Sequence, residues 1–207
     1  MSFKNPRETW DKRFRDADGY LFGTEPNAWL VESARFLAPA STVFCVADGE
    51  GRNSTYLAGL GHSVHAADLS PVAIEKLRAL AAERDVTVFA RVEGIEDWSW
   101  PEQSLDAVVA IFIQFAAPVA RALLFERIAA SLRPHGLLII EGYGLRQLRY
   151  RTGGPGVAEN LYDQALFAST FEGWQVLAAR DVDTHVSEGS GHRGRSHLVS
   201  AVLRKPG

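Results

Sequence analysis

Two pieces of sequence decide the fold: Val43-Phe-Cys-Val-Ala47-Asp48-Gly49-Glu-Gly51-Arg-Asn53, and Gly61-His-Ser-Val-His-Ala-Ala-Asp68-Leu-Ser70. In the first, an apolar run ends in two glycines before a helix-like segment. In the second, a short strand ends in one carboxylate. Glycines let the backbone pass close to a ligand, and a carboxylate after the second strand can accept hydrogen bonds from both ribose hydroxyls. The order predicts a site for a ligand that carries adenosine.

The glycine pattern narrows the class of ligand. Gly49-x-Gly51-x-x-Ser54 lacks the third glycine of the dinucleotide fingerprint. It therefore favours a nucleoside-bearing cofactor other than NAD, and the alternative is an ordinary strand–turn–helix connection. Asn53 is a suitable N-cap for the helix that follows.

Composition predicts one globular domain. The chain has 207 residues, 46% of them hydrophobic, which suffices for a proper core. A formal net charge of −3 gives no reason to expect a nucleic acid or an anionic membrane as partner. The amino-terminal residues are polar, and the longest apolar stretch, residues 107–120, is interrupted by Gln114 and Pro118 and is too short to span a bilayer. Cys45 is the single cysteine and is expected to be a small core residue, so a cytoplasmic location is the expectation.

Hydrophobic periodicity predicts alternating strands and helices. Strands are expected over 43–47, 63–67, 86–92, 105–112 and 137–140, and helices over 53–60, 71–84, 119–132 and 159–170. The helix at 71–84 follows Ser70, a good cap. Residues 142–157 are loop-like, and two late strands at 174–183 and 198–203 are joined by a polar loop, 184–197.

This alternation predicts an α/β fold with a doubly wound, mostly parallel seven-stranded sheet and helices on both faces. A late antiparallel strand would complete the sheet. Residues 1–207 are expected to form a single domain, with residues 1–40 as an aromatic, helical lid or cover.

Several motifs in order resemble one enzyme family. They are Gly49-Glu-Gly51-Arg-Asn53, Asp68-Leu69-Ser70, Leu105 to Phe112, Leu132-Arg-Pro-His135-Gly136, Trp10-Asp-x-Arg-Phe14, Phe22-Gly-x-x-Pro-Asn27, Gly153-Gly-Pro155 and Glu188-Gly-x-x-His192-x-Gly194. Together they resemble the class I S-adenosylmethionine-dependent methyltransferases, within the tellurite-resistance and thiopurine-methyltransferase-like branch. The chain departs from that pattern at Cys45, usually Asp, and at Ala47 and His135, usually Gly. Ala47 costs little if its backbone angles are ordinary, because only positive φ demands glycine.

The resemblance implies S-adenosylmethionine as cofactor and S-adenosylhomocysteine as product. It implies that Ala47, Gly49 and Gly51 present backbone to the cofactor, that Asp68 binds the ribose and that Leu69 packs beside the adenine. Gly94 and Ile95 would meet the adenine edge, and Ile111 would lie beneath the methionyl part. Asp48 stands where relatives carry a small residue. It could hold the methionyl ammonium, or it could point to solvent or cap a helix.

The acceptor side is less defined. Tyr20 and Phe22 could form part of a lid over a small-molecule acceptor, and Arg146 and Arg193 could bind an anionic one. Gln114, Glu141 and Tyr143 lie at the carboxyl ends of strands, where ligands bind in open sheets. Glu141 or His192 could take a proton from an amine or hydroxyl, whereas a soft nucleophile would need no base. No metal-ligand spacing stands out, and the protein is expected to be a monomer or homodimer.

Two other functions compete with methyl transfer to a small molecule. One is a non-catalytic S-adenosylmethionine-binding module, which the departures at Ala47 and His135 would suit. The other is a nucleotide-dependent oxidoreductase, against which stand the missing third glycine and the late strand pair.

Overall fold

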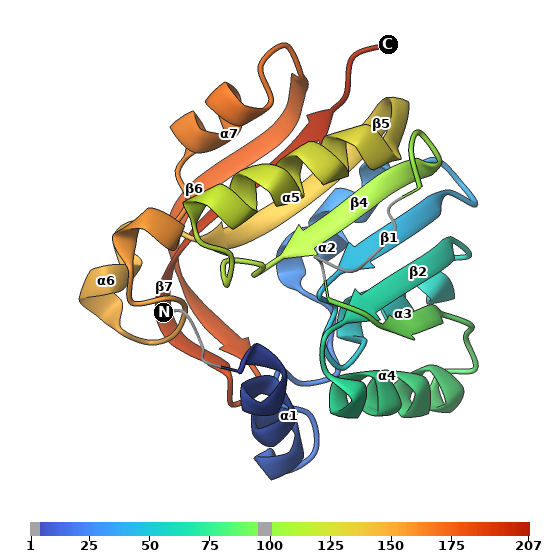
Figure 1. The fold of residues 1–207 in the computed structure, drawn as a ribbon, viewed down its shortest axis with the longest axis vertical. Helices are drawn as coiled ribbons and strands as arrows, with labels where there is room; N and C mark the ends of the chain where they lie inside the picture. The colour runs from blue at the N-terminus through green and yellow to red at the C-terminus, as the bar shows by residue number, and fades with distance from the viewer. Residues whose placement is uncertain (1–4, 95–100) are drawn as a thin grey trace.

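The computed structural model describes residues 5–94 and 101–207. Seven strands form one sheet in the order β3-β2-β1-β4-β5-β7-β6 (Figure 1). β5 and β6 both lie antiparallel to β7, and the other neighbours pair in parallel. The strands are β1 Thr42–Val46, β2 Ser63–Asp68, β3 Phe89–Val92, β4 Leu105–Ile111, β5 Leu132–Tyr143, β6 Gln175–Glu188 and β7 His192–Arg204. The predicted fold class is confirmed.

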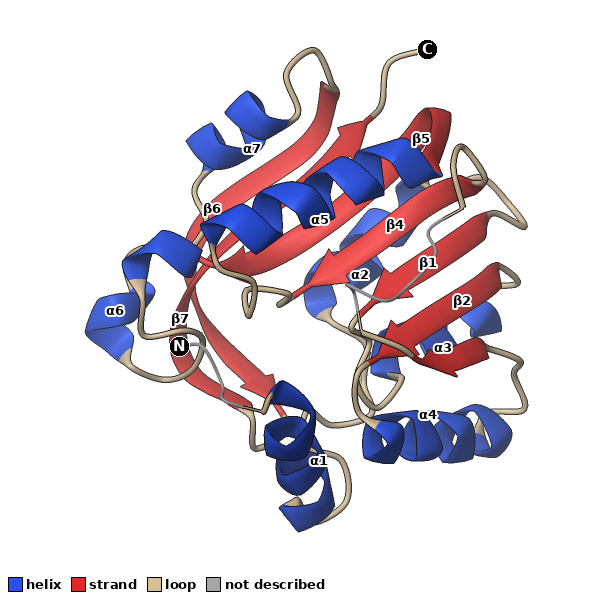
Figure 2. Cartoon of the chain, in the orientation of Figure 1, coloured by secondary structure: helices blue, strands red, loops and turns tan. Residues whose placement is uncertain are grey.

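Helices cover both faces of the sheet (Figure 2). They are α1 Pro6–Asp16, α2 Ala28–Ser33, α3 Arg52–Gly59, α4 Pro71–Glu83, α5 Pro118–Ser131, α6 Gln147–Tyr150 and α7 Gln164–Thr170, with short 3-10 helices at Ala34–Phe36 and Ala158–Asn160. Apolar side chains of α5 and α7 pack with one face of the sheet, and those of α2, α3 and α4 pack with the other.

The central strand β4 shows why its sequence is apolar throughout. Val108 and Ala110 join the core on the α5 side, whereas Val109 and Ile111 join the core on the opposite side. Successive side chains of a strand point to opposite faces, so a strand covered on both faces has no polar alternation.

The predicted caps have different outcomes. Ser70 caps α4 by accepting a hydrogen bond from the backbone N–H of Ala73 at 3.1 Å, as expected. Asn53 is not a cap, because α3 begins at Arg52 with Gly51 as its N-cap. The Asn53 side chain instead accepts from the backbone N–H of Asn27 at 3.0 Å, which ties the segment before α2 to α3.

The expected polar loop at 184–197 is wrong. β6 and β7 continue as a paired hairpin to Glu188 and His192, and only residues 189–191 turn. The polar residues of this arm follow from its position, because it extends past the covered part of the sheet and approaches α1 (Figure 1). The expected helix at 159–170 is split into the 3-10 turn Ala158–Asn160 and α7.

Candidate active site

A cavity of about 680 Å³ lies at the carboxyl ends of β1, β2 and β4. Its size is typical of a site for a small molecule or cofactor. Rings from the amino-terminal segment line one side of it: Trp10 and Phe14, whose centroids lie 5.6 Å apart, and Phe22. The cavity is where open α/β sheets bind ligands.

The glycine loop after β1 forms one wall. Ala47, Asp48 and Gly49 line the cavity, but Gly51 does not. A Cβ atom on Gly51 would lie 2.5 Å from Cγ of Leu77, and φ is +90° there. Gly51 is therefore required for the close packing of α3 on α4, and its predicted contact with the cofactor is not supported by its position.

Ala47 does not have ordinary backbone angles. Its φ is +46°, and His135 likewise has φ +65°. Non-glycine residues pay about 1–2 kcal/mol in the left-handed region. The condition under which Ala47 would cost little is therefore not met, and both departures from glycine carry conformational strain.

Asp68 ends β2 at the cavity and is 8% exposed. One carboxylate oxygen accepts from the backbone N–H of Gly49 and the other from that of Ser70, each at 2.9 Å. Burial raises the pKa of Asp68 to about 6, although these two hydrogen bonds oppose the shift. Each carboxylate oxygen retains a second lone pair, so the geometry suits recognition of a ribose diol.

Asp48 also lines the cavity, and its carboxylate accepts a hydrogen bond from the Ser54 hydroxyl. Burial raises the pKa of Asp48 to about 7, and the negative charge of Asp68 adds to that shift. A partly protonated carboxyl beside a ligand cavity suits a cationic ligand group, which would favour its ionised form. The alternatives of a solvent-directed side chain or a helix cap do not describe its position.

The remaining cofactor candidates agree with the cavity where they can be placed. Leu69, Gly94 and Ile111 line it, and Ile95 lies outside the described residues. Sequence analysis missed three lining residues: Arg52, Glu93 and Asn160. Each has a buried polar atom with no hydrogen-bond partner among the described residues, as does His192, which was assigned only a catalytic role. Buried polar atoms are normally paired, so these atoms fit a cavity whose ligand is polar.

Among the four predicted catalytic residues, only His192 lines the cavity. Its ring lies between the rings of Phe22 and Phe112, at centroid distances of 4.4 and 4.2 Å. Its Nδ1 is 3.5 Å from Oε2 of Glu188. Burial lowers the pKa of His192 although Glu188 raises it, so the ring is neutral at pH 7 and able to accept a proton.

The Gln114 side chain joins two backbone segments by hydrogen bonds. Its amide nitrogen donates to the backbone oxygens of Tyr143 and Asn160, at 2.8 and 3.1 Å, and its oxygen accepts from the backbone N–H of Tyr143 at 2.5 Å. These bonds use both amide hydrogens, so Gln114 has no donor left for an acceptor molecule. Its predicted role in orienting the acceptor is wrong.

Tyr143 is 1% exposed and does not line this cavity. Its ring packs against the Gly153–Gly154 turn, where a Cβ atom on Gly154 would lie 2.5 Å from the ring. Burial raises the pKa of Tyr143 well above the usual tyrosine value. The tyrosine is part of the wall behind His192, with 5.7 Å between ring centroids.

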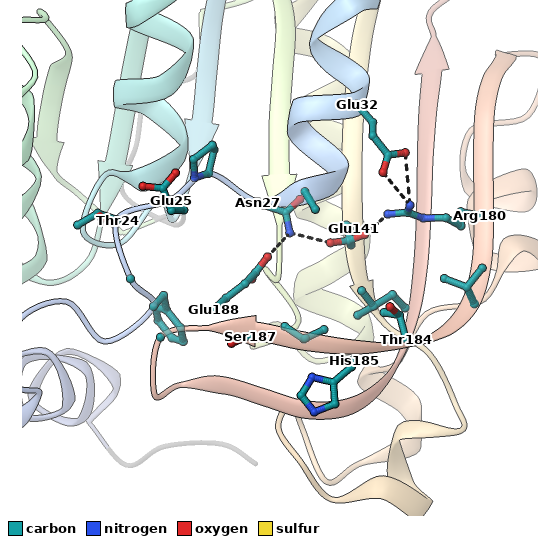
Figure 3. Close-up of a pocket in the computed structure, with 18 residues that line it drawn as sticks. Thr24, Glu25, Asn27, Glu32, Glu141, Arg180, Thr184, His185, Ser187 and Glu188 are labelled. Atoms are coloured by element: carbon teal, nitrogen blue, oxygen red, sulfur yellow. Dashed lines mark hydrogen bonds and ion pairs between the residues drawn. The ribbon is translucent and has the colours of Figure 1, made fainter.

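Glu141 lies in a second cavity of about 470 Å³, between residues 22–28 and the β6–β7 arm (Figure 3). It accepts from Asn27 at 2.8 Å and from the hydroxyl of Ser200 at 2.6 Å, and Arg180 is 3.6 Å away. Burial raises the pKa of Glu141. The structure therefore places this carboxylate behind the first cavity and separates it from the predicted acceptor site.

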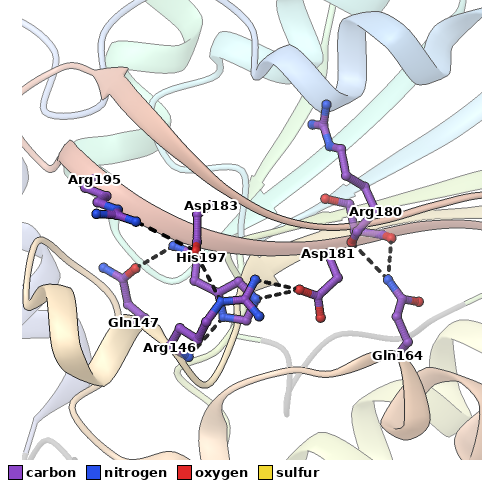
Figure 4. A network of polar contacts seen from close by, with 9 residues as sticks. Arg146, Gln147, Gln164, Arg180, Asp181, Asp183, Arg195 and His197 are labelled. Carbon is purple, nitrogen blue, oxygen red and sulfur yellow. Dashed lines mark hydrogen bonds and ion pairs between the residues drawn. The ribbon is translucent and has the colours of Figure 1, made fainter.

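Of the four predicted acceptor-binding residues, Phe22 alone lines the first cavity. Tyr20 donates to the backbone oxygen of Lys76 at 3.3 Å, and Arg193 is exposed on β7. Arg146 donates to Asp183 at 3.1 Å and to Asp181 at 2.8 Å on β6 (Figure 4). Arg146 is thus neutralised by acids distant in sequence, and neither Tyr20, Arg146 nor Arg193 lines the first cavity.

Among the described residues no group of three His, Cys, Asp or Glu side chains could hold a metal ion. No helix in residues 5–94 and 101–207 is long and apolar enough to cross a membrane.

The chain is similar to known methyltransferases in sequence and in fold. Residues 43–136 match the family model described as methyltransferase domain. The matched residues make up less than half of the chain and are similar to a methyltransferase domain. This confirms the predicted enzyme class and S-adenosylmethionine as the cofactor. No curated protein matches the chain.

Solved structures share the fold at low identity. One, from work on the conversion of a disulfide bond into a thioacetal group during echinomycin biosynthesis, has a TM-score of 0.80 and 18% identity, over 98% of this chain and 92% of that one. The N-methyltransferase NodS from Bradyrhizobium japonicum WM9, in complex with S-adenosylhomocysteine, has a TM-score of 0.74 and 14% identity, over 99% and 100%. A TehB-like methyltransferase from Corynebacterium glutamicum has a TM-score of 0.63 and 20% identity, over 97% and 100%.

The residues of the first cavity fit this cofactor. Asp68 offers acceptors to hydroxyl groups, and Asp48 and Arg52 bring opposite charges to the same wall. A zwitterionic amino-acid end requires such a pair of charges. The apolar side chains Leu69 and Ile111 supply surface for an adenine and a thioether chain.

Proposed function

We propose that the protein transfers the methyl group of S-adenosylmethionine to a small-molecule acceptor whose reacting atom is a soft nucleophile. The observation that carries the proposal is the position of His192, Phe22 and Phe112 in the same cavity as Asp68. Aromatic rings offer polarisable surface to sulfur and exclude water. The ionised arginines predicted for an anionic acceptor lie elsewhere, so a neutral or weakly acidic acceptor is favoured.

The cofactor, when bound, supplies an electrophilic methyl group. The protein's part is to hold the acceptor in line with that group, which can contribute several kcal/mol, up to about 7–11 in ideal cases. The rings of Trp10, Phe14 and Phe22 close one side of the cavity, in support of residues 1–40 as a cover within a single domain. A neutral His192 can remove a proton from the acceptor.

Two structural neighbours point the same way by analogy. One belongs to work on chemistry at a disulfide bond, and another is TehB-like. The branch of the family, the monomeric or homodimeric state, a cytoplasmic location and the absence of nucleic-acid partners are parts of the same proposal. A non-catalytic binding module is the competing function, and it predicts cofactor binding without turnover.

Titration calorimetry followed by product analysis tests the proposal. S-adenosylmethionine and S-adenosylhomocysteine should bind with micromolar affinity, about −8 kcal/mol, and NAD should not. Phenylmethanethiol, an apolar thiol, should then be converted to its methyl thioether, detected by mass spectrometry. Asp68→Ala should abolish saturation at micromolar cofactor, and the exposed Asp18→Ala serves as its control. Binding with no methylation of thiols, selenols or amines would favour the non-catalytic module.

A further inference from the structure

Glu188 joins the first cavity to the second. Its Oε2 is 2.7 Å from Nη2 of Arg52 and 3.5 Å from Nδ1 of His192, and its Oε1 accepts from Asn27 at 3.0 Å. Figure 3 shows Asn27 bound between Glu188 and Glu141. Each carboxylate oxygen therefore has a fixed donor, and the orientation of Glu188 is determined before any ligand binds.

Three aromatic rings surround the His192 ring and leave it open only toward the first cavity. Phe22 and Phe112 lie against its ring, and Tyr143 meets it edge-on with 89° between the ring planes. Phe112 has φ +55°, a conformation that costs a bulky residue free energy. Such strain occurs where the surroundings determine a geometry that function requires. Since Nδ1 faces Glu188, Nε2 is the ring nitrogen left for the cavity.

We infer that Glu188 is a positioning residue that keeps the proton of His192 on Nδ1, so that Nε2 can accept a proton from the acceptor. The inference rests on the proposed methyl transfer and narrows its substrate class. A carboxylate that fixes the tautomer of a histidine is a known arrangement for proton removal. The separation of 3.5 Å is longer than a hydrogen bond, and such contacts commonly shorten when ligands are bound.

The charge distribution around His192 agrees with this role. Glu188 of β6 stabilises the imidazolium, while Arg52 of α3 and Arg13 of α1 disfavour it, and Tyr143 of β5 stays neutral. Although burial alone would raise it, the contacts with His192 and Arg52 hold the pKa of Glu188 at about 2. Glu188 therefore stays ionised, and the histidine is the member of this pair that gains and loses a proton.

The step that follows is balanced. The lone pair of the acceptor atom forms the new bond to the methyl carbon. The bond from that carbon to the sulfonium sulfur breaks, and its electron pair stays on sulfur. The proton of the acceptor atom passes to Nε2 of His192 and then to solvent. The substrate class is a protic nucleophile, with a thiol as its soft member.

The tautomer of His192 can be measured directly. Long-range proton–nitrogen NMR of the full-length protein with S-adenosylhomocysteine should show His192, assigned with His192→Gln, with Nδ1 protonated and Nε2 free at pH 7.5. Glu188→Gln should lose that preference, and Glu188→Asp should keep part of it. Glu32→Gln is the matched control, because Glu32 lines the second cavity at 3.1 Å from Arg180. A wild-type His192 protonated on Nε2 would overturn the inference.

Turnover gives an independent readout. Glu188→Gln should lower kcat at least tenfold with phenylmethanethiol, which enters protonated. The same substitution should change kcat less than threefold with 4-nitrobenzenethiol, which is already ionised at pH 7.5. Equal losses with both thiols, or none, would contradict the role of Glu188. If S-adenosylhomocysteine does not bind, the proposed function fails, but the tautomer in the ligand-free protein still tests the inference.

Discussion

Cofactor affinity should depend on pH through Asp48. The carboxyl lines the cofactor cavity, and burial raises its pKa to about 7. A ligand ammonium beside it would favour the ionised form, so the pKa should fall on binding. Below pH 7 the free protein must first lose that proton. Affinity for S-adenosylhomocysteine should therefore be highest above pH 8 and fall as the pH is lowered.

The size of the effect follows from the two carboxyls in the cavity. With a pKa of about 7 in the free protein, protonation of Asp48 should weaken binding about 30-fold between pH 8 and pH 5.5, about 2 kcal/mol. Asp68, with a pKa of about 6, should add about fourfold over the same range. Asp48→Asn keeps an acceptor for Ser54 but cannot titrate. It should retain only the smaller dependence.

Titration calorimetry at pH 5.5, 7 and 8 measures the pH dependence of affinity for the wild type and for Asp48→Asn. Repeating the pH 7 titration in buffers of different ionisation enthalpy should show release of about half a proton on binding. A dissociation constant that is the same at pH 5.5 and pH 8 would refute the reasoning. So would an unchanged pH dependence in Asp48→Asn, because it would assign the titration to another group.

Three further perturbations test the site and the fold. Asp68→Ala should weaken cofactor binding by about 1.5–3 kcal/mol, the range for hydrogen bonds to a charged group; calorimetry checks this, with Asp106→Asn, which lies at the opposite end of the sheet, as control. His135→Gly should raise the free energy of unfolding in urea by about 0.5–1 kcal/mol, because it relieves an exposed residue at φ +65°; unchanged stability would show that this backbone is not strained. Protonation of Asp48 should make the ligand-free protein more stable at pH 6 than at pH 8 by about 1.4 kcal/mol, because Asp48 binds a proton in the folded state at a pH where the unfolded chain does not; Asp48→Asn should remove that contribution and leave only the smaller one of Asp68.

Local signals predicted the parallel half of the fold well. Apolar runs, glycines and the Ser70 cap lie next to the features they specify, so β1, β2, β4 and α4 follow from the sequence alone. The β6–β7 arm could not be predicted from the sequence, because its polar residues match a loop as well as an exposed hairpin. Only the ladder between residues 175–188 and 192–204 distinguishes the two, and that pairing is not encoded in either segment by itself.

The same distinction explains the site. Asp68, Leu69 and Gly49 could be predicted because each follows its strand directly, where a parallel sheet gathers its ligands. Arg146 could not be judged, because Asp181 and Asp183 lie on a strand more than thirty residues away. Gln114 likewise looked available until β5 and the turn at Asn160 were seen to use its amide. A polar side chain near a strand end is a candidate for function only when its own hydrogen bonds leave it free.

Glu188 shows the converse. In the sequence it is part of a motif with His192, four residues along, and nothing distinguishes it from a surface acid. In the fold, Arg52 and Asn27 come from separate segments to fix its two oxygens. Burying an ionised carboxylate costs free energy unless it is paired, and pairing with Arg52 alone would satisfy that need. The contact with the neutral His192 is additional, so Glu188→Gln should impair proton removal as well as the stability that the pair with Arg52 provides.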